Sequence, residues 1–243
     1  MSNKNIDNKV LIIIPSYNEE LNIKKTVERL KKVIETSKYN IEYVVINDGS
    51  TDNTSKVCCE NKYNTINLIE NLGIGGCVQT GYKYALQNDY DIAIQFDGDG
   101  QHDEKYIDKL IDSICEGNDF VIGSRFKGKV SKFTSTTSRK LGIKIISNII
   151  KICTGKIIYD TTSGFRAANR KAIEIFCKDY PQEYPEPEST VNLICKKLKV
   201  DEIPVNMYER EHGKSSIYLH KNIYYMVSVC LAIIIRSIKS RRK

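Results

Sequence analysis

The hydrophobic and polar residues of this chain follow two alternating patterns. Short apolar runs at residues 10–14, 41–46 and 92–96 are typical of buried strands, which are apolar on both faces in a parallel sheet. The segment at residues 22–36 instead places its apolar residues at helical spacing. Strands that alternate with helices predict an α/β fold, with a mostly parallel central sheet and helices on both faces. The other predicted strands cover residues 64–69, 120–122 and 200–205, and the other predicted helices cover residues 51–60, 77–87, 103–115, 139–153, 170–177 and 189–197.

Polar and glycine-rich loops follow four of these strands, at residues 15–20, 47–52, 71–76 and 97–103. Because the carboxyl ends of parallel strands lie at one edge of a sheet, these loops are expected to meet there. Together they offer an aromatic ring, carboxylates and glycines that permit close backbone approach, which are the parts that bind a nucleotide diphosphate. The glycines at residues 73–76 alone do not match the dinucleotide-binding fingerprint.

The most informative of these loops begins with Asp97-Gly98-Asp99-Gly100-Gln101. Alternate residues of an extended chain point the same way, so the carboxylates of Asp97 and Asp99 and the amide oxygen of Gln101 can converge on one hard divalent cation. Such an ion leaves coordination positions for substrate phosphates. The alternative is an acidic, glycine-rich turn that is merely solvated.

Length and composition favour one domain in a reducing compartment. A chain of 243 residues that is 41% hydrophobic can bury a single substantial core. Its eight cysteines form no CxxC pair, which argues against disulfides and a zinc site. The polar N-terminus at residues 1–9 has no apolar signal region, so we expect a cytoplasmic protein.

The basic charge is concentrated in the last thirty residues. The net charge is +7, and residues 214–243 carry seven Lys or Arg and no Asp or Glu. We therefore divide the chain into a neutral domain at residues 1–213 and a basic, apolar helical tail at residues 214–243. The apolar stretch at residues 223–235 is shorter than the ~20 residues that span a bilayer.

A short apolar helix with a cationic end suits the surface of an anionic membrane. The alternative is a helix docked on the core or on a partner protein. We expect no nucleic-acid partner, because the basic residues of the tail are not interleaved with stacking aromatics on an exposed face.

The order of six motifs resembles the family 2 glycosyltransferases, which have the GT-A fold. The resemblance covers nearly the whole chain, and within the family it is strongest for the dolichyl-phosphate mannose synthase group and its bacterial polyprenyl-phosphate relatives. This subgroup is indicated by Asp97-x-Asp99-x-Gln101-His102 and by the stretch at residues 202–216. The six motifs lie at residues 13–19, 45–52, 71–73, 97–102, 123–126 and 163–166.

The resemblance implies a donor site for a nucleotide sugar. The base and ribose would be held by Pro15, Tyr17, Glu19 and Asp48, with Gly73, Asp97 and Arg166 as further donor-site positions. The chain departs from the family at Asn47, where a second aspartate is usual, so the identity of the base stays open.

The resemblance also implies a metal and an acceptor side. Asp97, Asp99 and Gln101 would bind Mg2+ or Mn2+ across the diphosphate. Arg125 and Arg139 would lie near the donor diphosphate and the acceptor phosphate, and residues 163–166 would shape the acceptor side. The segment at residues 127–137 between the two arginines has no apolar period and reads as a loop that closes over the donor.

The reaction chemistry assigns the catalytic candidates. Breaking a sugar–phosphate bond builds negative charge on the departing diphosphate, which a metal and guanidinium groups stabilise. A lipid phosphate is already ionised and needs no base, whereas a sugar hydroxyl does. Glu186 and Glu188 are candidate bases; alternatively, Glu188 only favours a helix N-terminus. His102 either contacts a phosphate or acceptor or makes local hydrogen bonds.

We therefore expect a metal-dependent, inverting glycosyltransferase. It would transfer a hexose from a nucleotide-diphosphate sugar to a polyprenyl phosphate at the cytoplasmic membrane face, with Asp99, Arg125, Arg139 and Glu188 as catalytic candidates. The nearest alternative is transfer to a sugar hydroxyl of a lipid-linked glycan in cell-surface polysaccharide synthesis. A nucleotidyltransferase and a non-catalytic scaffold are two further hypotheses. The sequence does not decide whether the protein binds a membrane-protein partner or forms a homo-oligomer.

Overall fold

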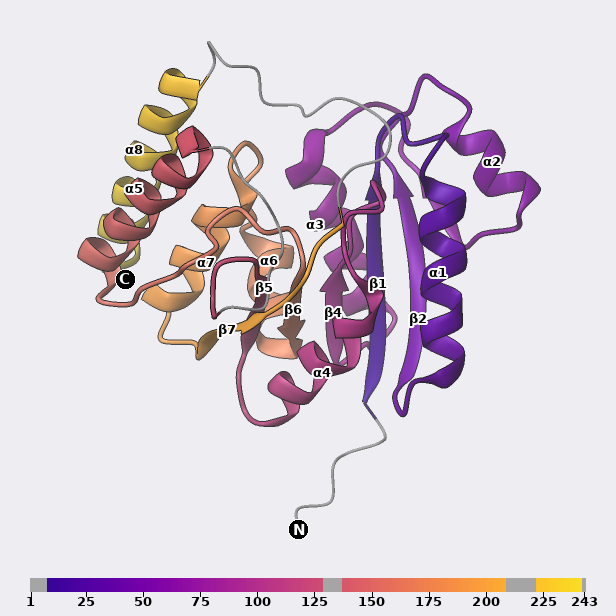
Figure 1. Ribbon diagram of the computed structural model, residues 1–243, viewed down its shortest axis with the longest axis horizontal. Coiled ribbons are helices and arrows are strands. Elements are labelled where there is room, and N and C mark those ends of the chain that lie inside the picture. Colours follow the sequence, from indigo (N-terminus) through magenta and orange to yellow (C-terminus); the bar gives the residue numbers. More distant parts are fainter. Residues whose placement is uncertain (1–7, 129–136, 209–221, 242–243) are drawn as a thin grey trace.

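The computed structural model describes residues 8–128, 137–208 and 222–241. Figure 1 shows a central sheet with helices packed on both of its faces. The strands are β1 (Lys9–Ser16), β2 (Asn40–Asn47), β3 (Thr65–Asn67), β4 (Ile92–Gln95), β5 (Phe120–Ser124), β6 (Arg166–Asn169) and β7 (Val200–Pro204). The helices are α1 (Ile23–Thr36), α2 (Thr54–Glu60), α3 (Gly73–Gln87), the 3-10 turn η1 (Glu104–Tyr106), α4 (Ile107–Cys115), α5 (Thr137–Thr154), α6 (Arg170–Lys178), α7 (Pro185–Cys195) and α8 (Asn222–Arg241).

The sheet confirms the mostly parallel arrangement predicted from the sequence. Its strand order within the described residues is β3-β2-β1-β4-β6-β5-β7. Only β6 is antiparallel to its neighbours, β4 and β5. The sequence did not predict β6, because Arg166-Ala167-Ala168-Asn169 lacks the β-branched and aromatic residues that mark a strand. Tertiary pairing on both sides stabilises this segment.

Alternate residues of the strands supply two separate cores. Leu11 and Ile13 of β1 are fully buried in one core, together with side chains from α3, α6 and α7. Ile12 and Ile14 are fully buried in the other, together with side chains from α1 and α4. Because both faces of the central strands are buried, their sequences read as continuous apolar runs.

Two helices begin earlier than their sequences indicate. α3 begins at Gly73, whereas the prediction began at residue 77. α7 begins at Pro185 rather than at residue 189, with a proline at its first helical positions. Proline is tolerated there because the first N–H groups of a helix have no partner within it. Glu186 and Glu188 therefore lie inside the first turn of α7.

α8 packs beside α5 and α7 at one end of the molecule (Figure 1). The predicted helix at residues 223–235 is thus present and extends to Arg241. Within the described part of the chain, no helix is long and apolar enough to cross a membrane. All eight cysteines are free thiols.

Candidate functional site

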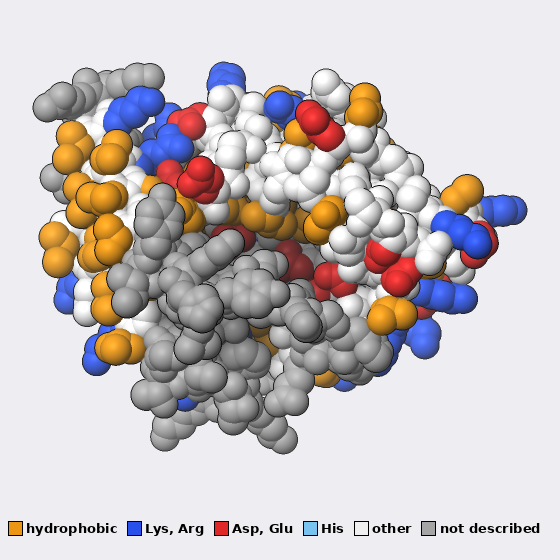
Figure 2. All heavy atoms as spheres, turned by 90° about the horizontal axis from the view of Figure 1, so that it is seen from above, with side chains coloured by type: hydrophobic (Ala, Val, Ile, Leu, Met, Phe, Trp, Pro, Cys, Tyr) orange, Lys and Arg blue, Asp and Glu red, His pale blue; other side chains and the backbone are white. Residues whose placement is uncertain are grey.

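The loops after β1, β2 and β4 meet at the carboxyl edge of the sheet, as predicted. Asp48 N donates to Ser16 O at 2.9 Å, and Gly98 N donates to Pro15 O at 3.2 Å. Asn18 adopts a left-handed backbone conformation with φ 54°. Its side-chain oxygen accepts from Thr51 N at 2.9 Å. Figure 2 looks onto this edge and shows acidic side chains in a hollow between the elements.

The carboxylate of Asp97 is held on three sides. Its Oδ1 accepts from Gln95 Nε2 at 3.0 Å, and its Oδ2 lies 3.0 Å from His102 Nε2. Gly164 lies against the same carboxylate, since a Cβ added there would be 2.4 Å from Oδ2. Burial alone would raise the pKa of Asp97, but the nearby His102, Gln95 and Arg166 outweigh it and hold the pKa below its ordinary value. The Asp97 carboxylate is therefore ionised and held in one position.

His102 orients Asp97 from a buried aromatic site. Its ring stacks on Phe165 at a centroid distance of 4.9 Å and meets the edge of Phe96 at 5.5 Å. Its Nδ1 has no hydrogen-bond partner among the described residues. The backbone of His102 also forms a bridge with Met207, which follows β7. The geometry therefore gives His102 a positioning role at Asp97.

Asp99 and Gln101 lie in a loop that α1 holds in place. Asp99 Oδ1 accepts from Gln101 N at 3.0 Å. Arg29 of α1 donates to Gly100 O at 3.2 Å and to His102 O at 3.0 Å, and it pairs with Glu104. The Gln101 side-chain amide approaches Tyr208 O at 3.5 Å. Arg29 was not a candidate from the sequence, because no motif distinguishes it from the other cations of α1.

The donor set fits a metal that takes further ligands from its substrate. Asp97 and Asp99 come from one loop, and the described residues include no group of three His, Cys, Asp or Glu side chains that could hold an ion alone. Two carboxylates with neighbouring amide oxygens suit a hard cation that is completed by diphosphate oxygens and water. These residues could therefore provide part of a coordination sphere.

Asp48 anchors the start of α3. Its Oδ1 accepts from Leu72 N at 2.8 Å. Burial raises the pKa of Asp48, although the backbone N–H groups of Leu72 and Gly73 oppose that shift. The neighbouring Asn47 points to Asn67, with Nδ2 2.8 Å from its Oδ1. The Asn47 side chain therefore links strand β2 to strand β3.

Tyr17 and Glu19 occupy different positions in the first loop. The ring of Tyr17 is 45% exposed at the edge, where a base could stack on it. Glu19 accepts through Oε2 from Asn22 Nδ2 at 2.7 Å, and its backbone N donates to Thr54 Oγ1 at 2.9 Å. Glu19 thus organises the start of α1 and its contact with α2.

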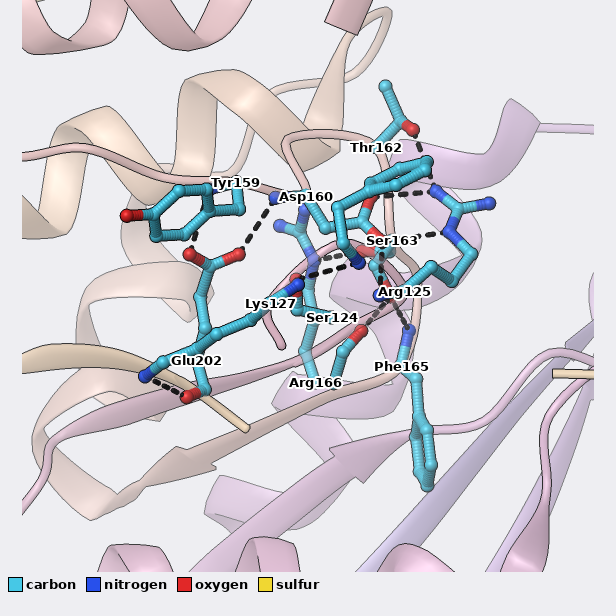
Figure 3. Close-up of polar contacts among 12 residues, drawn as sticks. Ser124, Arg125, Lys127, Tyr159, Asp160, Thr162, Ser163, Phe165, Arg166 and Glu202 are labelled. Carbon is cyan, nitrogen blue, oxygen red and sulfur yellow. Dashed lines mark hydrogen bonds and ion pairs between the residues drawn. The ribbon is translucent and has the colours of Figure 1, made fainter. Parts of the chain in front are cut away.

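Arg125 is part of a buried ionic network (Figure 3). Its Nε and Nη2 donate to the two carboxylate oxygens of Asp160, each at 2.7 Å, and Nη2 also donates to Thr162 Oγ1 at 2.9 Å. Asp160 N and Tyr159 N both donate to the carboxylate of Glu202 at 2.8 Å. Burial raises the pKa of Glu202. The network fixes the turn that presses Gly164 against Asp97.

Arg166 is buried beside Asp97 and the first turn of α7. Its Nη1 donates to Glu186 O at 2.7 Å and to Ser189 Oγ at 3.0 Å. Its Nη2 is buried with no hydrogen-bond partner among the described residues. The cross-strand partner of Arg166 is Gln95, which contacts Asp97. Only the unpredicted strand β6 reveals this pairing.

The two carboxylates of the α7 turn face different surroundings. Burial raises the pKa of Glu186, and the charge of Asp97 adds to that shift while Arg166 opposes it. Burial also raises the pKa of Glu188, but this carboxylate lies 3.9 Å from Arg236 Nε of α8, whose charge opposes the shift. The structure therefore brings Glu186, and not Glu188, into the electrostatic environment of Asp97. A role of Glu188 as a base stays a prediction without a geometric partner at the site.

The structure describes the remaining acceptor-side candidates only in part. Arg139 lies near the start of α5, but its side chain is outside the described residues. Most of the predicted loop at residues 127–137 is also outside them. Lys127, at its start, pairs with Asp201 at 2.9 Å.

Comparisons with known proteins identify one family. A family model described as Glycosyl transferase family 2 matches residues 11–176. The chain is 31% identical, over 85% of its length and 88% of the relative's, to the UDP-N-acetylglucosamine–dolichyl-phosphate N-acetylglucosaminyltransferase of Methanococcus voltae. It is 26% identical, over 86% of its length and 81% of the relative's, to the polyprenol monophosphomannose synthase of Mycolicibacterium smegmatis.

A solved structure has the same fold. It is the glucosyl-3-phosphoglycerate synthase of Mycobacterium tuberculosis in complex with Mn2+, uridine diphosphate and phosphoglyceric acid. The TM-score is 0.71 at 13% identity, and the match covers 95% of this chain and 79% of that one. The predicted GT-A fold is thereby confirmed.

Proposed function

This chain belongs to glycosyl transferase family 2, and from that premise we propose that it transfers a hexose from a nucleotide-diphosphate sugar to a polyprenyl phosphate. The transfer depends on a divalent metal, inverts the anomeric centre and takes place at the inner face of the cell membrane. The enzyme is then peripheral to that membrane.

The observation that carries this proposal is the fixed, ionised Asp97 at the junction of the three loops. His102, Gln95 and Gly164 surround its carboxylate, and Asp99 follows two residues later. Two carboxylates in the loop after β4, at the same edge of the sheet as the exposed Tyr17, suit a metal-bound nucleotide diphosphate. Relatives named for dolichyl and polyprenyl phosphates support a lipid phosphate as the acceptor.

We assign the following roles to the residues of the site. Pro15, Tyr17, Asp48 and Gly73 form the donor edge, and Asp97 and Asp99, with Gln101 as a third ligand, hold Mg2+ or Mn2+. A metal held there would neutralise the charge that develops on the leaving diphosphate. Arg125 stabilises the acceptor side through its rigid pair with Asp160. The ionised acceptor phosphate attacks without a protein base.

Transfer to a sugar hydroxyl is the second candidate function, and one observation favours it. Burial raises the pKa of Glu186, which is the direction expected for a general base that acts near neutral pH. Glu186 also lies in the electrostatic environment of Asp97. A hydroxyl acceptor would use this carboxylate.

The test is a transfer assay with a panel of donors. The purified protein is incubated with Mn2+ or Mg2+, a polyprenyl phosphate and different nucleotide sugars, and the released nucleotide and the lipid product are identified. We expect a nucleoside diphosphate and a hexosyl phospholipid, both lost in Asp99→Ala. Release of pyrophosphate from a nucleoside triphosphate would indicate a nucleotidyltransferase, and the absence of metal-dependent donor binding would refute the proposal.

A further inference from the structure

α8 is apolar on two faces. Val229 and Ile233 are fully buried on the side that packs against α5 and α7. Leu231 and Ile235, on the other side, are 54% and 62% exposed. A helix that is apolar around most of its circumference is normally covered on every side. One face of α8 is thus covered by this chain, and the other lacks a cover among the described residues.

α5 repeats the same pattern beside it. Ile146 and Ile150 are buried, whereas Leu141 and Ile152 are 60% and 80% exposed. The two helices touch closely, because a Cβ added at Gly142 would be 3.3 Å from Met226 Sδ of α8. Figure 2 shows hydrophobic side chains gathered at the end of the molecule where these helices lie. The α5–α8 surface comprises the exposed residues Leu141, Ile145, Ile152, Val227, Leu231, Ile234, Ile235 and Ile238.

Single exposed apolar side chains are common, but eight on two adjoining helices form a patch that needs a partner. The charge of the helices indicates which partner. Neither α5 nor α8 contains an Asp or Glu. Lys140, Lys144, Lys151 and Lys239 are exposed on them. Apolar side chains flanked only by cations complement the headgroups and acyl boundary of an anionic bilayer.

Two acidic side chains that approach α8 do not weaken this complementarity. Asp179 pairs with Arg236 at 2.5 Å, and Glu188 lies 3.9 Å from the same guanidinium. These contacts lie on the side of α8 that faces α7, where they fix the helix to the domain. The hydrogen bond from Arg236 lowers the pKa of Asp179, so this attachment is retained at neutral pH.

We propose that the α5–α8 surface seats the protein on an anionic bilayer, with both helices lying in the plane of the interface. The surface is composite, so α8 alone does not suffice. α5 belongs to the segment between β5 and β6, both of whose ends lie at the carboxyl edge of the sheet. Docking of this surface on a bilayer does not depend on catalysis. The further idea that docking brings the enzyme to a lipid acceptor rests on the proposed function.

Vesicle flotation tests this proposal with the full-length chain. The vesicles contain either phosphatidylcholine alone or equal parts of phosphatidylcholine and phosphatidylglycerol. Two double variants remove the apolar surface from one helix each: Leu231→Asp with Ile235→Asp, and Leu141→Asp with Ile145→Asp. Ile69→Asp is the matched control, because Ile69 is fully exposed in the connection between β3 and α3. Circular dichroism and the melting temperature show that each variant is folded.

We expect the wild type and the control to float with the anionic vesicles, and each double variant to bind at least about tenfold more weakly. Binding to phosphatidylcholine alone should be weaker than binding to the anionic vesicles. Unchanged binding in either double variant would overturn the composite surface. Equal binding to both vesicle types, no vesicle binding, or a dimer in solution that either double variant dissolves would overturn the bilayer as the partner.

Enzyme activity separates this proposal from the proposed function. With a short-chain acceptor dissolved in detergent, both folded double variants should transfer at the wild-type rate, since neither helix face contacts the described donor site. Loss of flotation with normal transfer would locate the defect in docking. Absence of transfer in the wild type, with normal flotation, would refute the proposed function and leave the docking surface intact.

Discussion

At the residue scale, the position of Asp97 depends on side chains far away in the sequence. The sequence predicted Asp97 and Asp99 correctly as residues of one edge loop, because an apolar strand directly precedes them. It included Gly164 in the motif at residues 163–166, but it did not indicate that the missing side chain makes room for the Asp97 carboxylate. It also chose Glu188 rather than Glu186 as the catalytic candidate, because their different surroundings depend on how α7 packs against α8 and β6.

Gly164→Ala tests the importance of this close approach. A Cβ at 2.4 Å from Asp97 Oδ2 must displace the carboxylate. We expect the melting temperature to fall modestly and turnover to fall roughly a hundredfold. Gly155→Ala is the control, because Gly155 has φ +79° and open space around it. That change strains the backbone by about 1 kcal/mol without touching the site, so turnover should be unchanged.

Glu186→Gln and Glu188→Gln distinguish the two acceptor classes. If the acceptor is a phosphate, no base is needed, and both variants should keep their turnover within about tenfold of the wild type. A loss of about a hundredfold or more in Glu186→Gln alone would instead indicate a hydroxyl acceptor. Glu188→Gln is the matched control, because Glu188 lies beside Arg236. Steady-state rates with saturating donor provide the measurement.

At the element scale, the sequence predicted the strands with long apolar runs and missed the one without. β6 is a strand because β4 and β5 pair with it on both sides, and this nonlocal pairing leaves no periodic trace in four residues. Its omission hid the proximity of Arg166 to Gln95. The turn before β6 is held by Asp160 and Glu202, which lie 42 positions apart in the sequence.

The ionic network predicts a pH dependence of stability. Burial raises the folded-state pKa of Glu202 above its ordinary value of 4.5, and Asp160 adds to the shift. A raised carboxyl pKa contributes stability at low pH that is lost as the pH rises through the folded-state value. The free energy of unfolding of the wild type, relative to Glu202→Gln, should therefore fall as the pH rises from 4.5. Urea unfolding of both proteins at several pH values measures this, and a pH-independent difference would contradict it.

At the scale of the whole molecule, the fold and family were predictable because the six motifs occur in the order in which the strands deliver them to one edge. Local periodicity predicts the α/β class, the parallel sheet and the edge at which the loops meet. It does not predict the surface formed by α5 and α8, since the two helices are about 80 residues apart and only packing brings them together.

Ligand binding to the whole protein gives a further prediction. Mn2+ with a nucleoside diphosphate, at about a hundredfold above the dissociation constant, should raise the melting temperature by about 5 °C or more. Chelation of the metal should remove most of the shift, because Asp97 and Asp99 then face the diphosphate without a cation. Asp99→Asn should abolish the shift. Asp89→Asn should keep it, because the Asp89 carboxylate pairs with Arg170 outside the site. A full shift in the presence of a chelator would argue against a metal.

The reversed direction of β6 has one more consequence. β5 ends and β6 begins at the same edge, where Gly123 N donates to Phe165 O at 2.8 Å. The stretch from residue 125 to residue 165 therefore leaves the sheet and returns to it at adjacent points. Its length can change at little entropic cost and without altering any strand pairing. We accordingly expect insertions within this stretch to leave the sheet intact, provided that Asp160 and Gly164 keep their contacts with Arg125 and Asp97.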